Sequence, residues 1–386
     1  METKRRESVL GIIGWDMFEY IVEDLEDTRR FYRDKMDLPE IARLNESSRG
    51  ERGEDAAMFQ VGNAPLICTS PLDKGSRAGR WLKRHPEGIS LLALRVRDLD
   101  ATYRELEKRG ATIWTPITKT LDRSGATCRY LEIATPLGDV RLRFSERPND
   151  SLLPGFEYKD GPDAGNRFGL QVVDHVTSNM LTIEPYITWL RDVLGFEEYW
   201  RIQFHTQDAG SEYGNAEGTG LFSIVMWDPG SGIKLANNEP LAPNFEKSQI
   251  STFVEDNGGP GVQHIAFHVK DIISTVDGLR REGMNFLDTP GTYYDMLPER
   301  LRNRKVSSIQ EDLDTLRKLG ILVDGNDDRY LLQIFSLEGK MLHHSEQGGP
   351  FFYEVIQRRG ARGFGEGNFR ALFEAIERDQ KARGRV

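Results

Sequence analysis

The stretch GWDMFEYIVEDLEDTRRFYRDKMDLPE (residues 14–40) has a counterpart in VVDHVTSNMLTIEPYITWLRDVLGFEE (residues 172–198). Both open with an apolar, strand-like run, Asp16 and Asp174 stand third in the two copies, and an Arg-Asp dipeptide recurs at the same offset. A duplicated unit of this length constrains a fold more tightly than local propensity does. The sequence therefore predicts a repeated architecture.

A second pair of similar segments extends this repeat. GISLLALRVRDLDATYRELEKRGATIWTP (residues 88–116) parallels GVQHIAFHVKDIISTVDGLRREGMNFLDTP (residues 261–290), with a strand, an Asp, an amphipathic helix, a Gly turn and another strand in each. Two units in each half predict an α+β fold with four modules in two tandem domains. A turn-rich stretch separates the halves, so we predict domains at residues 1–150 and 169–386, joined by a linker at residues 151–168.

Composition narrows the class of partner. The 386 residues carry a formal net charge of −10, which disfavours nucleic acid and anionic membrane surfaces. No run approaches the roughly 20 apolar residues of a membrane-spanning helix. Cys68 and Cys128 are the only cysteines, too few for a disulfide framework, and this fits a reducing, cytoplasmic location.

Three polar residues stand in apolar, strand-like runs of the second half: His175, His264 and Glu354. A buried carboxylate is costly unless it is paired or binds a cation, and neutral imidazole is the commonest nitrogen ligand of metals. Two His and one carboxylate on one face of a metal leave positions open for substrate and dioxygen, as in non-heme Fe(II) oxygenases. The three residues are therefore the candidate metal ligands.

The first copy of the repeat is an internal control on this hypothesis. Met17 aligns with His175, Leu91 aligns with His264, and Leu142 is the expected counterpart of Glu354. A single buried His is often just a hydrogen-bonded core residue. Three apolar counterparts indicate that the fold alone does not require polarity at these positions.

The other histidines are expected to have no part in the metal site. His268 follows His264 by four residues, but on a strand this spacing separates side chains by about 13 Å. His85, His205, His343 and His344 lie in polar segments and are predicted to be surface residues.

Seven motifs of the second half together carry a family resemblance. They are VDHVTSNM (from 173), SQISTF (from 248), GVQHIAF (from 261), TYYDML (from 292), LLQIF (from 331), FFYEVIQRRG (from 351) and GFGEGNFRALFEAIERDQ (from 363). In this order they resemble the 4-hydroxyphenylpyruvate dioxygenase family, strongly from residue 169 to 385 and mainly in domain layout before that. The resemblance implies a vicinal oxygen chelate fold with an open barrel-like sheet in each domain, and one Fe(II) per chain, held in the second domain. It also implies conversion of 4-hydroxyphenylpyruvate and dioxygen to homogentisate and carbon dioxide, a step of tyrosine catabolism.

The resemblance also assigns roles to site residues. His175, His264 and Glu354 match the iron ligands. The residues that match the substrate pocket are Ser223, Asn238, Gln249, Gln263, Gln333, Phe335, Phe352 and Phe369. In this chain Ala236 and Asn237, just before Asn238, depart from the Pro and aliphatic residues expected there. A 2-oxo acid can chelate Fe(II) through its carboxylate and keto oxygens, and amides can meet the phenol without adding charge.

The last segment is expected to close over the site. It comprises Phe364, Gly365, Gly367, Asn368 and Leu372, with Asn368 as a helix cap and an apolar stripe from Phe369 onward. The stripe alone would be ordinary core packing. The glycines could let the helix swing as a lid that excludes water.

Three alternatives remain open at this point. They are 4-hydroxymandelate synthase, which Phe369 argues against, an extradiol ring-cleaving dioxygenase, and a non-catalytic small-molecule-binding protein of the same fold. We expect a small 2-oxo acid and dioxygen as partners, and a homo-oligomer whose contacts lie on the metal-free domain.

Overall fold

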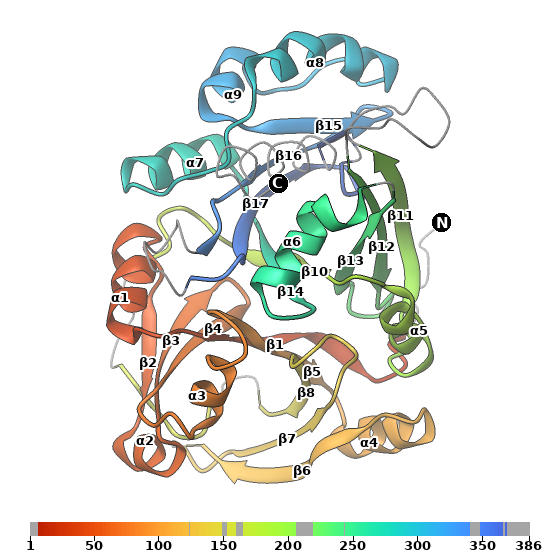
Figure 1. The fold of residues 1–386 in the computed structure, drawn as a ribbon. Helices are drawn as coiled ribbons and strands as arrows, with labels where there is room; N and C mark the ends of the chain where they lie inside the picture. Colours follow the sequence, from red (N-terminus) through yellow and green to blue (C-terminus); the bar gives the residue numbers. More distant parts are fainter. Residues whose placement is uncertain are drawn as a thin grey trace.

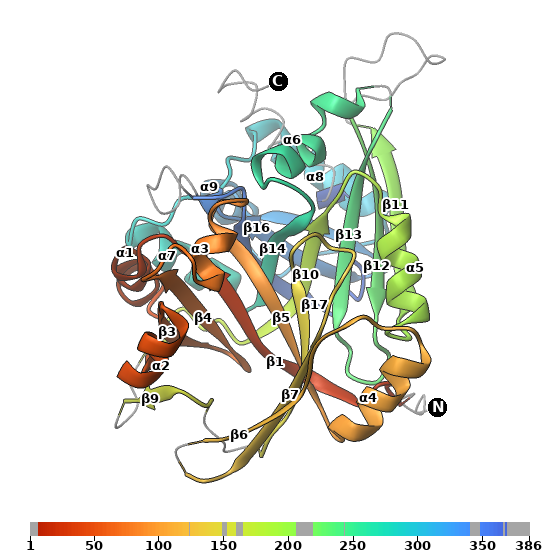
Figure 2. The same cartoon turned by 60° about the horizontal axis from the view of Figure 1, so that its bottom comes forward.

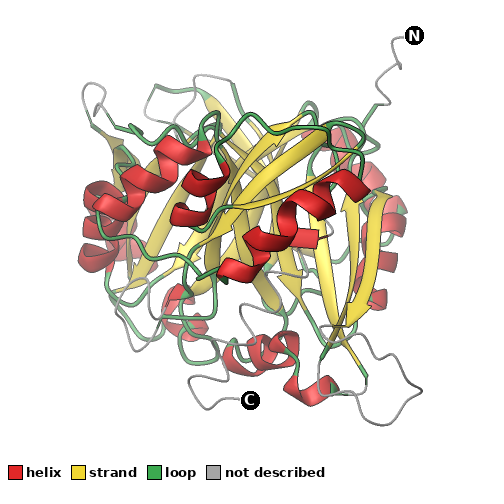
Figure 3. Ribbon diagram, turned by 90° about the horizontal axis from the view of Figure 1, so that it is seen from above, coloured by secondary structure: helices red, strands yellow, loops and turns green. Residues whose placement is uncertain are grey.

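The computed structural model describes residues 7–122, 124–148, 153–159, 165–205, 219–242, 244–339, 348–365 and 367–368. Two curled mixed sheets with helices around them form the molecule (Figure 1). Figure 3 shows the strands gathered in the middle and the helices on the outside. The α+β class and the repeated modules predicted from the sequence are confirmed.

The front sheet is built from two βαβββ modules. The first contains β1 (Ile12–Ile21), α1 (Leu25–Arg30), β2 (Glu40–Leu44), β3 (Glu54–Val61) and β4 (Ala64–Pro71), and the second contains β5 (Gly88–Val96), α4 (Leu99–Lys108), β6 (Ile113–Leu121), β7 (Thr127–Ile133) and β8 (Arg141–Glu146). A π-helical turn (Phe31–Lys35), α2 (Glu46–Arg52), α3 (Arg77–Trp81) and the edge strand β9 (Phe156–Tyr158) complete it. The strand order is β6-β7-β8-β5-β1-β4-β3-β2-β9, so the two modules meet at β5 and β1.

The rear sheet repeats this plan. Its first module contains β10 (Val172–Asn179), α5 (Glu184–Asp192), β11 (Glu197–His205), β12 (Gly220–Trp227) and β13 (Lys234–Leu241), and its second contains β14 (Gly261–His268), α7 (Ile272–Arg281), β15 (Leu322–Asn326), β16 (Arg329–Phe335) and β17 (Phe352–Arg359). Its additions are a 3-10 turn (Phe245–Lys247), α6 (Gln249–Asp256), α8 (Gly291–Asn303) and α9 (Leu313–Leu319). The order β11-β12-β13-β10-β14-β17-β16-β15 matches that of the front sheet.

In three of the four modules, an Asp after the first strand is the N-cap of the following helix, whereas Ile183 precedes α5 without a side-chain cap. Asp24, Asp98 and Asp271 have extended backbones, and their side chains accept a hydrogen bond from the backbone N–H three residues on. An acceptor at this position satisfies a backbone donor that the first helical turn leaves open. The strand-to-helix step is therefore encoded locally, which explains why the repeat is visible in the sequence.

The two sheets pack against each other through a shared apolar core. Residues from both halves belong to one buried cluster, and the hydroxyl groups of Tyr32 and Tyr353 lie 2.5 Å apart across the boundary. His85 also lies there: it is buried, with Nδ1 2.7 Å from Asn257 O and Nε2 2.8 Å from Asp139 Oδ2. The prediction that His85 is a surface residue is wrong, because the polar loop that carries it is covered by the other half of the chain.

Helix α6 lies across one open end of the rear sheet, as Figures 1 and 2 show from two directions. Ser248 caps it, and it packs against β10 and β13. No helix of the described residues is long and apolar enough to cross a bilayer. The proposed domain boundaries at residues 150 and 169 stay predictions.

Candidate metal centre

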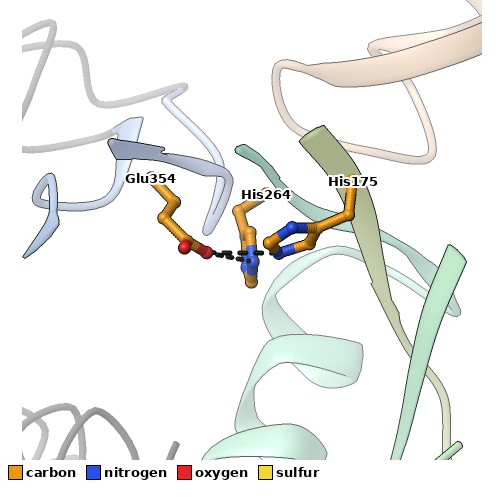
Figure 4. A group of neighbouring side chains, drawn as sticks. All are labelled: His175, His264 and Glu354. Atoms are coloured by element: carbon orange, nitrogen blue, oxygen red, sulfur yellow. Dashed lines mark ion pairs between the residues drawn. The ribbon is translucent and has the colours of Figure 1, made fainter. Parts of the chain in front are cut away.

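His175, His264 and Glu354 come together on three neighbouring strands, β10, β14 and β17 (Figure 4). All three are buried. One oxygen of Glu354, Oε2, lies 3.2 Å from His175 Nε2 and 3.3 Å from His264 Nε2. The three ligand atoms all lie within 4.8 Å of one another. Side chains separated by roughly ninety residues of sequence each way therefore converge on one point.

A β-bulge aims the first histidine. The register between β10 and β14 shifts between Val173 and His175, so Asp174 is the extra residue. Neighbouring residues of a regular strand face opposite sides of a sheet, and a bulge re-aims them. Asp174 and His175 consequently lie side by side, with Asp174 Oδ1 2.9 Å from His175 Nδ1.

Each of the three side chains is oriented by a hydrogen bond on the side away from the common point. Asp174 holds Nδ1 of His175, Gln263 Oε1 lies 3.1 Å from Nδ1 of His264, and Gln333 Nε2 donates to Glu354 Oε1 at 2.8 Å. These bonds leave Nε2 of His175 and Nε2 of His264 directed at Oε2 of Glu354. Partners of this kind fix the tautomer and rotamer of metal ligands.

The electrostatics favour an anionic Glu354 and set the two histidines apart. Burial would lower the pKa of His175, but Glu354 and Asp174 outweigh burial and raise it. Burial would raise the pKa of Glu354, but His175 and then His264 outweigh burial and lower that pKa to about 2. Burial lowers the pKa of His264, which keeps this ring neutral and able to ligate. His264 Nε2 makes no hydrogen bond among the described residues, although it is buried.

The donor set and its spacing fit a divalent transition metal. Two ligand atoms that each lie about 2.1 Å from a cation, at right angles to each other, are separated by about 3 Å. The two carboxylate-to-imidazole separations are 3.2 and 3.3 Å. A buried imidazole nitrogen without a hydrogen bond, next to a buried carboxylate, is the arrangement that a bound cation would complete.

Aromatic rings enclose this cluster. Phe352 stacks on His264 with ring centroids 4.8 Å apart, and Phe335 meets the same ring edge-on at 6.1 Å. Phe364 meets His175 at 4.8 Å and stacks on Trp200. The predicted pocket residues Phe335 and Phe352 therefore lie beside the candidate ligands, as does Phe364 of the predicted closing segment.

The predicted polar pocket residues are all buried in the rear sheet or α6. Ser223 on β12 pairs directly with Asn238 on β13, and Ser223 Oγ and Asn238 Oδ1 have no hydrogen-bond partner among the described residues. Asn237, one of the departing residues, donates to the carbonyl oxygens of Ile224 and Leu235 and so serves the sheet. Gln249 is the first residue of α6.

The closing segment touches the cluster through Asn368. Glu354 as a carboxylate can only accept, so Gln333 must turn its amide nitrogen to Glu354 and its oxygen to Asn368, whose Nδ2 donates at 3.0 Å. Gly365 has a φ of 72°, and a Cβ there would lie 2.9 Å from Gln333 Oε1. Gly367 N donates to Asp324 Oδ2 at 2.9 Å. Phe369 and Leu372 lie outside the described residues.

Two groups of residues at the site were missed by sequence reasoning. Arg358 forms a two-pronged ion pair with Asp174, with Nε and Nη2 each 2.7 Å from a carboxylate oxygen. Burial would raise the pKa of Asp174, but Arg358 and His175 hold it well below its usual range. Tyr293 OH contacts Asn368 Oδ1 at 2.8 Å and accepts from Arg300 at 2.6 Å. The recurrence of Asp16 and Asp174 in the two repeats was the one sequence feature that pointed to this ion pair.

The front sheet holds the same frame without the ligands. Met17 sits after a bulge at Asp16, as His175 does after Asp174, and Leu91 takes the place of His264. Ala93 pairs with Arg143 as Ala266 pairs with Glu354, so Arg143 is the counterpart of Glu354. The predicted alignment with Leu142 is wrong by one residue, because apolar matching chose the core-facing neighbour on β8.

The orienting ion pair is present in both sheets. Arg147 Nε lies 2.8 Å from Asp16 Oδ1, as Arg358 lies against Asp174. Asp16 Oδ2, which is buried, has no hydrogen-bond partner among the described residues, since Met17 offers no donor where His175 does. The cation of Arg143 at the third position would also repel a metal ion.

Comparisons with known proteins agree with this architecture. The model of the glyoxalase/bleomycin resistance protein/dioxygenase superfamily matches residues 14–138 and 172–296. The chain is 36% identical over 346 residues to a 4-hydroxyphenylpyruvate dioxygenase of Dictyostelium discoideum, covering 87% of this chain and 90% of the relative. It is 35% identical to the enzyme of that name from Danio rerio, covering 97% and 92%.

Solved structures show the same fold. A triple mutant of 4-hydroxymandelate synthase from Streptomyces coelicolor superposes with a TM-score of 0.78 at 26% identity, covering 96% of this chain and 99% of that one. A fusion of a xylose isomerase-like TIM barrel with a 4-hydroxyphenylpyruvate dioxygenase superposes with a TM-score of 0.72 at 18% identity, covering 98% of this chain and 54% of that one.

Proposed function

The chain belongs to the 4-hydroxyphenylpyruvate dioxygenase family of the glyoxalase superfamily, and from this we propose that the His175–His264–Glu354 cluster binds one Fe(II) and forms its active site. The enzyme is a dioxygenase. Its substrate is 4-hydroxyphenylpyruvate, which it converts with dioxygen to homogentisate and carbon dioxide. One observation carries the assignment of the site: Glu354 Oε2 lies 3.2 and 3.3 Å from two imidazole nitrogens that are themselves oriented from behind.

Fe(II) held by His175, His264 and Glu354 would offer open coordination positions to a 2-oxo acid and dioxygen, and the oxidation of the 2-oxo acid would supply the electrons. The residues of the chain hold and isolate that sphere. Asp174 and Gln263 fix the imidazole tautomers, and Gln333 holds Glu354 so that one oxygen faces the metal. The preference for iron over other divalent metals rests on the ligand set and the family.

The same cluster suggests how the substrate is held. The rings of Phe335, Phe352 and Phe364 give apolar walls on which an aromatic substrate can pack. Ser223 and Asn238 keep buried polar atoms without partners among the described residues, and these can hydrogen-bond to substrate groups. Gln249 and Phe369 are proposed pocket residues on the resemblance alone.

Asn368 links this pocket to the closing segment, which we propose acts as a lid over the bound substrate. Its hydrogen bond to Gln333 joins the segment to the residue that orients Glu354. Closure of the segment would therefore affect the orientation of the proposed metal ligand Glu354. Exclusion of water from the oxidising site is the expected benefit.

Product identification tests the reaction. The enzyme is incubated with Fe(II), ascorbate, dioxygen and 4-hydroxyphenylpyruvate, and homogentisate is separated from 4-hydroxymandelate by chromatography. The likeness to 4-hydroxymandelate synthase makes that product the specific competing outcome. Glu354→Gln should form neither product. Glu198→Gln, which alters an ion pair on the outer strand β11, should form the same product as the parent. Iron retained by Glu354→Gln at the parent level would contradict the ligand assignment.

We further propose a cytoplasmic homo-oligomer that binds neither nucleic acid nor membranes. Cys68 and Cys128 are both buried and form no disulfide, which suits a reducing compartment. Sedimentation of the purified enzyme measures the oligomeric state directly. A monomer across the micromolar range would exclude the homo-oligomer.

A further inference from the structure

The curled front sheet encloses a cavity of about 440 Å³, which we call the front cavity. Its lining includes apolar residues, Met17, Leu44, Ala56, Ile67, Leu91 and Phe156, and charged residues, among them Asp16, Glu19, Glu54, Glu132, Arg77, Arg141 and Arg143. Met17, Leu91 and Arg143 are the counterparts of the three candidate metal ligands. The front cavity therefore lies where the rear sheet has its active site.

A domain with a purely structural role has little reason to keep such an interior. Ion pairs buried in a protein are often no more stabilising than apolar residues of the same volume. The side chain of Glu132 is 3% exposed and that of Glu54 is 5% exposed, while a cavity of this size also forgoes packing contacts. The volume falls within the range of cavities that hold small molecules.

Two carboxylates of the front cavity, those of Glu132 and Glu19, are already engaged. Glu132 accepts hydrogen bonds from Arg141 and Arg143. Glu19 accepts from Thr69 at 3.0 Å, from Arg77 at 2.5 Å and from Ser90 at 3.0 Å. These two carboxylates therefore offer a ligand no further acceptor.

Hydrogen-bond donors, in contrast, are left over. Arg141 donates through Nη1 to Glu132, and its Nε and Nη2 make no hydrogen bond to any described residue. Burial lowers the pKa of Arg141, Glu132 and Glu19 oppose this, and the neighbouring Arg77 and Arg143 lower it further. These N–H groups of Arg141 can donate hydrogen bonds to the carboxylate of a ligand.

A second hollow leads to the same arginines. It has a volume of about 180 Å³, shares Arg77 and Arg141 with the front cavity, and is also bordered by Arg80, Arg84 and Trp114. Trp114 is 63% exposed. The arginines of this second hollow can attract the charge of an organic anion, and the exposed ring of Trp114 can contact its apolar part.

From these observations we propose that the front cavity is a second ligand site, which binds a small organic carboxylate with an apolar body. The carboxylate pairs with Arg141 and Arg143, whose planar donor groups match it. The apolar body packs against Met17, Leu91 and Phe156. Asp16 Oδ2, buried at the edge of the front cavity without a partner among the described residues, offers one acceptor to a ligand hydroxyl group.

Calorimetric titration of the iron-loaded, full-length enzyme under nitrogen tests this site, with 4-hydroxyphenylacetate as the probe. The binding should persist in Glu354→Gln, which alters the rear site, and should weaken roughly ten- to a hundredfold in Arg141→Met. Arg201→Met, which removes a surface arginine paired with Glu198, is the control and should bind as the parent does. The neutral analogue 4-ethylphenol should bind at least roughly tenfold more weakly than the acid.

A second variant guards against misfolding of Arg141→Met. Ala56→Leu enlarges an apolar residue that lines the front cavity. It should weaken the binding of the probe while all charged residues remain. Turnover of 4-hydroxyphenylpyruvate should stay at the parent level in Ala56→Leu, which separates this site from the proposed active site. Equal binding by the parent, Arg141→Met and Ala56→Leu, or binding that is lost in Glu354→Gln alone, would overturn the proposal.

Discussion

Gln333 donates its side-chain amide to Oε1 of Glu354 over 2.8 Å, and so decides which oxygen of the carboxylate faces the two imidazoles. The carbonyl oxygen of the same amide accepts from Asn368, which in turn contacts Tyr293. Arg300 on α8 completes this row of contacts. A candidate metal ligand is thereby connected to a surface helix and to the closing segment through four side chains.

Replacing Gln333 by Leu should weaken metal binding because Glu354 loses the hydrogen bond that orients it. Loss of such a partner typically lowers metal affinity roughly ten- to a hundredfold. Titration with Co(II), followed by its absorption spectrum, measures the effect. Gln357→Leu is the matched control, since Gln357 on the neighbouring strand β17 is also a buried amide but accepts from Ile272 N at the start of α7. Equal loss of affinity in both variants would argue for a general packing defect.

Asp174→Asn and Asp16→Asn form a matched pair because the two residues stand at equivalent bulges, in β10 and β1, and each pairs with an arginine. Each variant should lower the free energy of unfolding, by about 3 kcal/mol or more where the arginine is left buried without its charge partner. Metal affinity should fall only in Asp174→Asn, which also loosens His175. Urea unfolding and Co(II) titration of both variants measure the two effects. A drop in affinity in Asp16→Asn would show that the halves are coupled.

Gly365→Ala should be harmful, and Gly363→Ala should be tolerated. Gly365 has a φ of 72°, and its added Cβ would lie 2.9 Å from Gln333 Oε1, whereas nothing lies within 4 Å of a Cβ at Gly363. The left-handed backbone alone costs a non-glycine residue roughly 1–2 kcal/mol. Turnover and the ratio of dioxygen consumed to product formed should both suffer in Gly365→Ala. Similar behaviour of the two variants would argue against a closing segment that depends on this contact.

Acid should destabilise the protein partly through Glu19. Burial would raise the pKa of Glu19, but Arg77, Arg141 and Arg143 outweigh burial and lower it from 4.5 to about 2. Because the folded-state pKa is the lower one, the contribution to stability is fully present above pH 4.5 and is lost as the pH falls towards 2. The loss between pH 5 and pH 3 is on the order of 2 kcal/mol. Urea unfolding at both values should show a smaller difference in Glu19→Gln than in the parent chain.

The fold and the central cluster were accessible from the sequence because both leave a periodic trace. The repeat carries a strand followed by a helix in each copy, and a capping Asp in three of the four, so the α+β modules could be predicted. His175, His264 and Glu354 stood out since a buried polar group in an apolar strand needs a partner. The structure brings these three together, and their role as iron ligands stays a proposal.

What escaped prediction depends on register and on contacts between distant segments. Successive residues of a strand face opposite sides of the sheet. An error of one position in the alignment therefore matched Glu354 with Leu142 instead of Arg143, and the charged residue inside the front sheet was missed. His85 looked like a loop residue because nothing local reveals that Asn257 covers it. Arg358 and Tyr293 act through partners far along the chain, which one sequence without relatives does not disclose.

The unsatisfied oxygen of Asp16 makes the front half a scaffold for protein engineering. The substitutions Met17→His, Leu91→His and Arg143→Glu would recreate the three side chains on equivalent strands. Asp16 Oδ2 could then accept a hydrogen bond from the imidazole at position 17. Such a chain would carry two reaction centres built on one blueprint, and the designed one could be tuned for other oxidations while the native one keeps its own substrate.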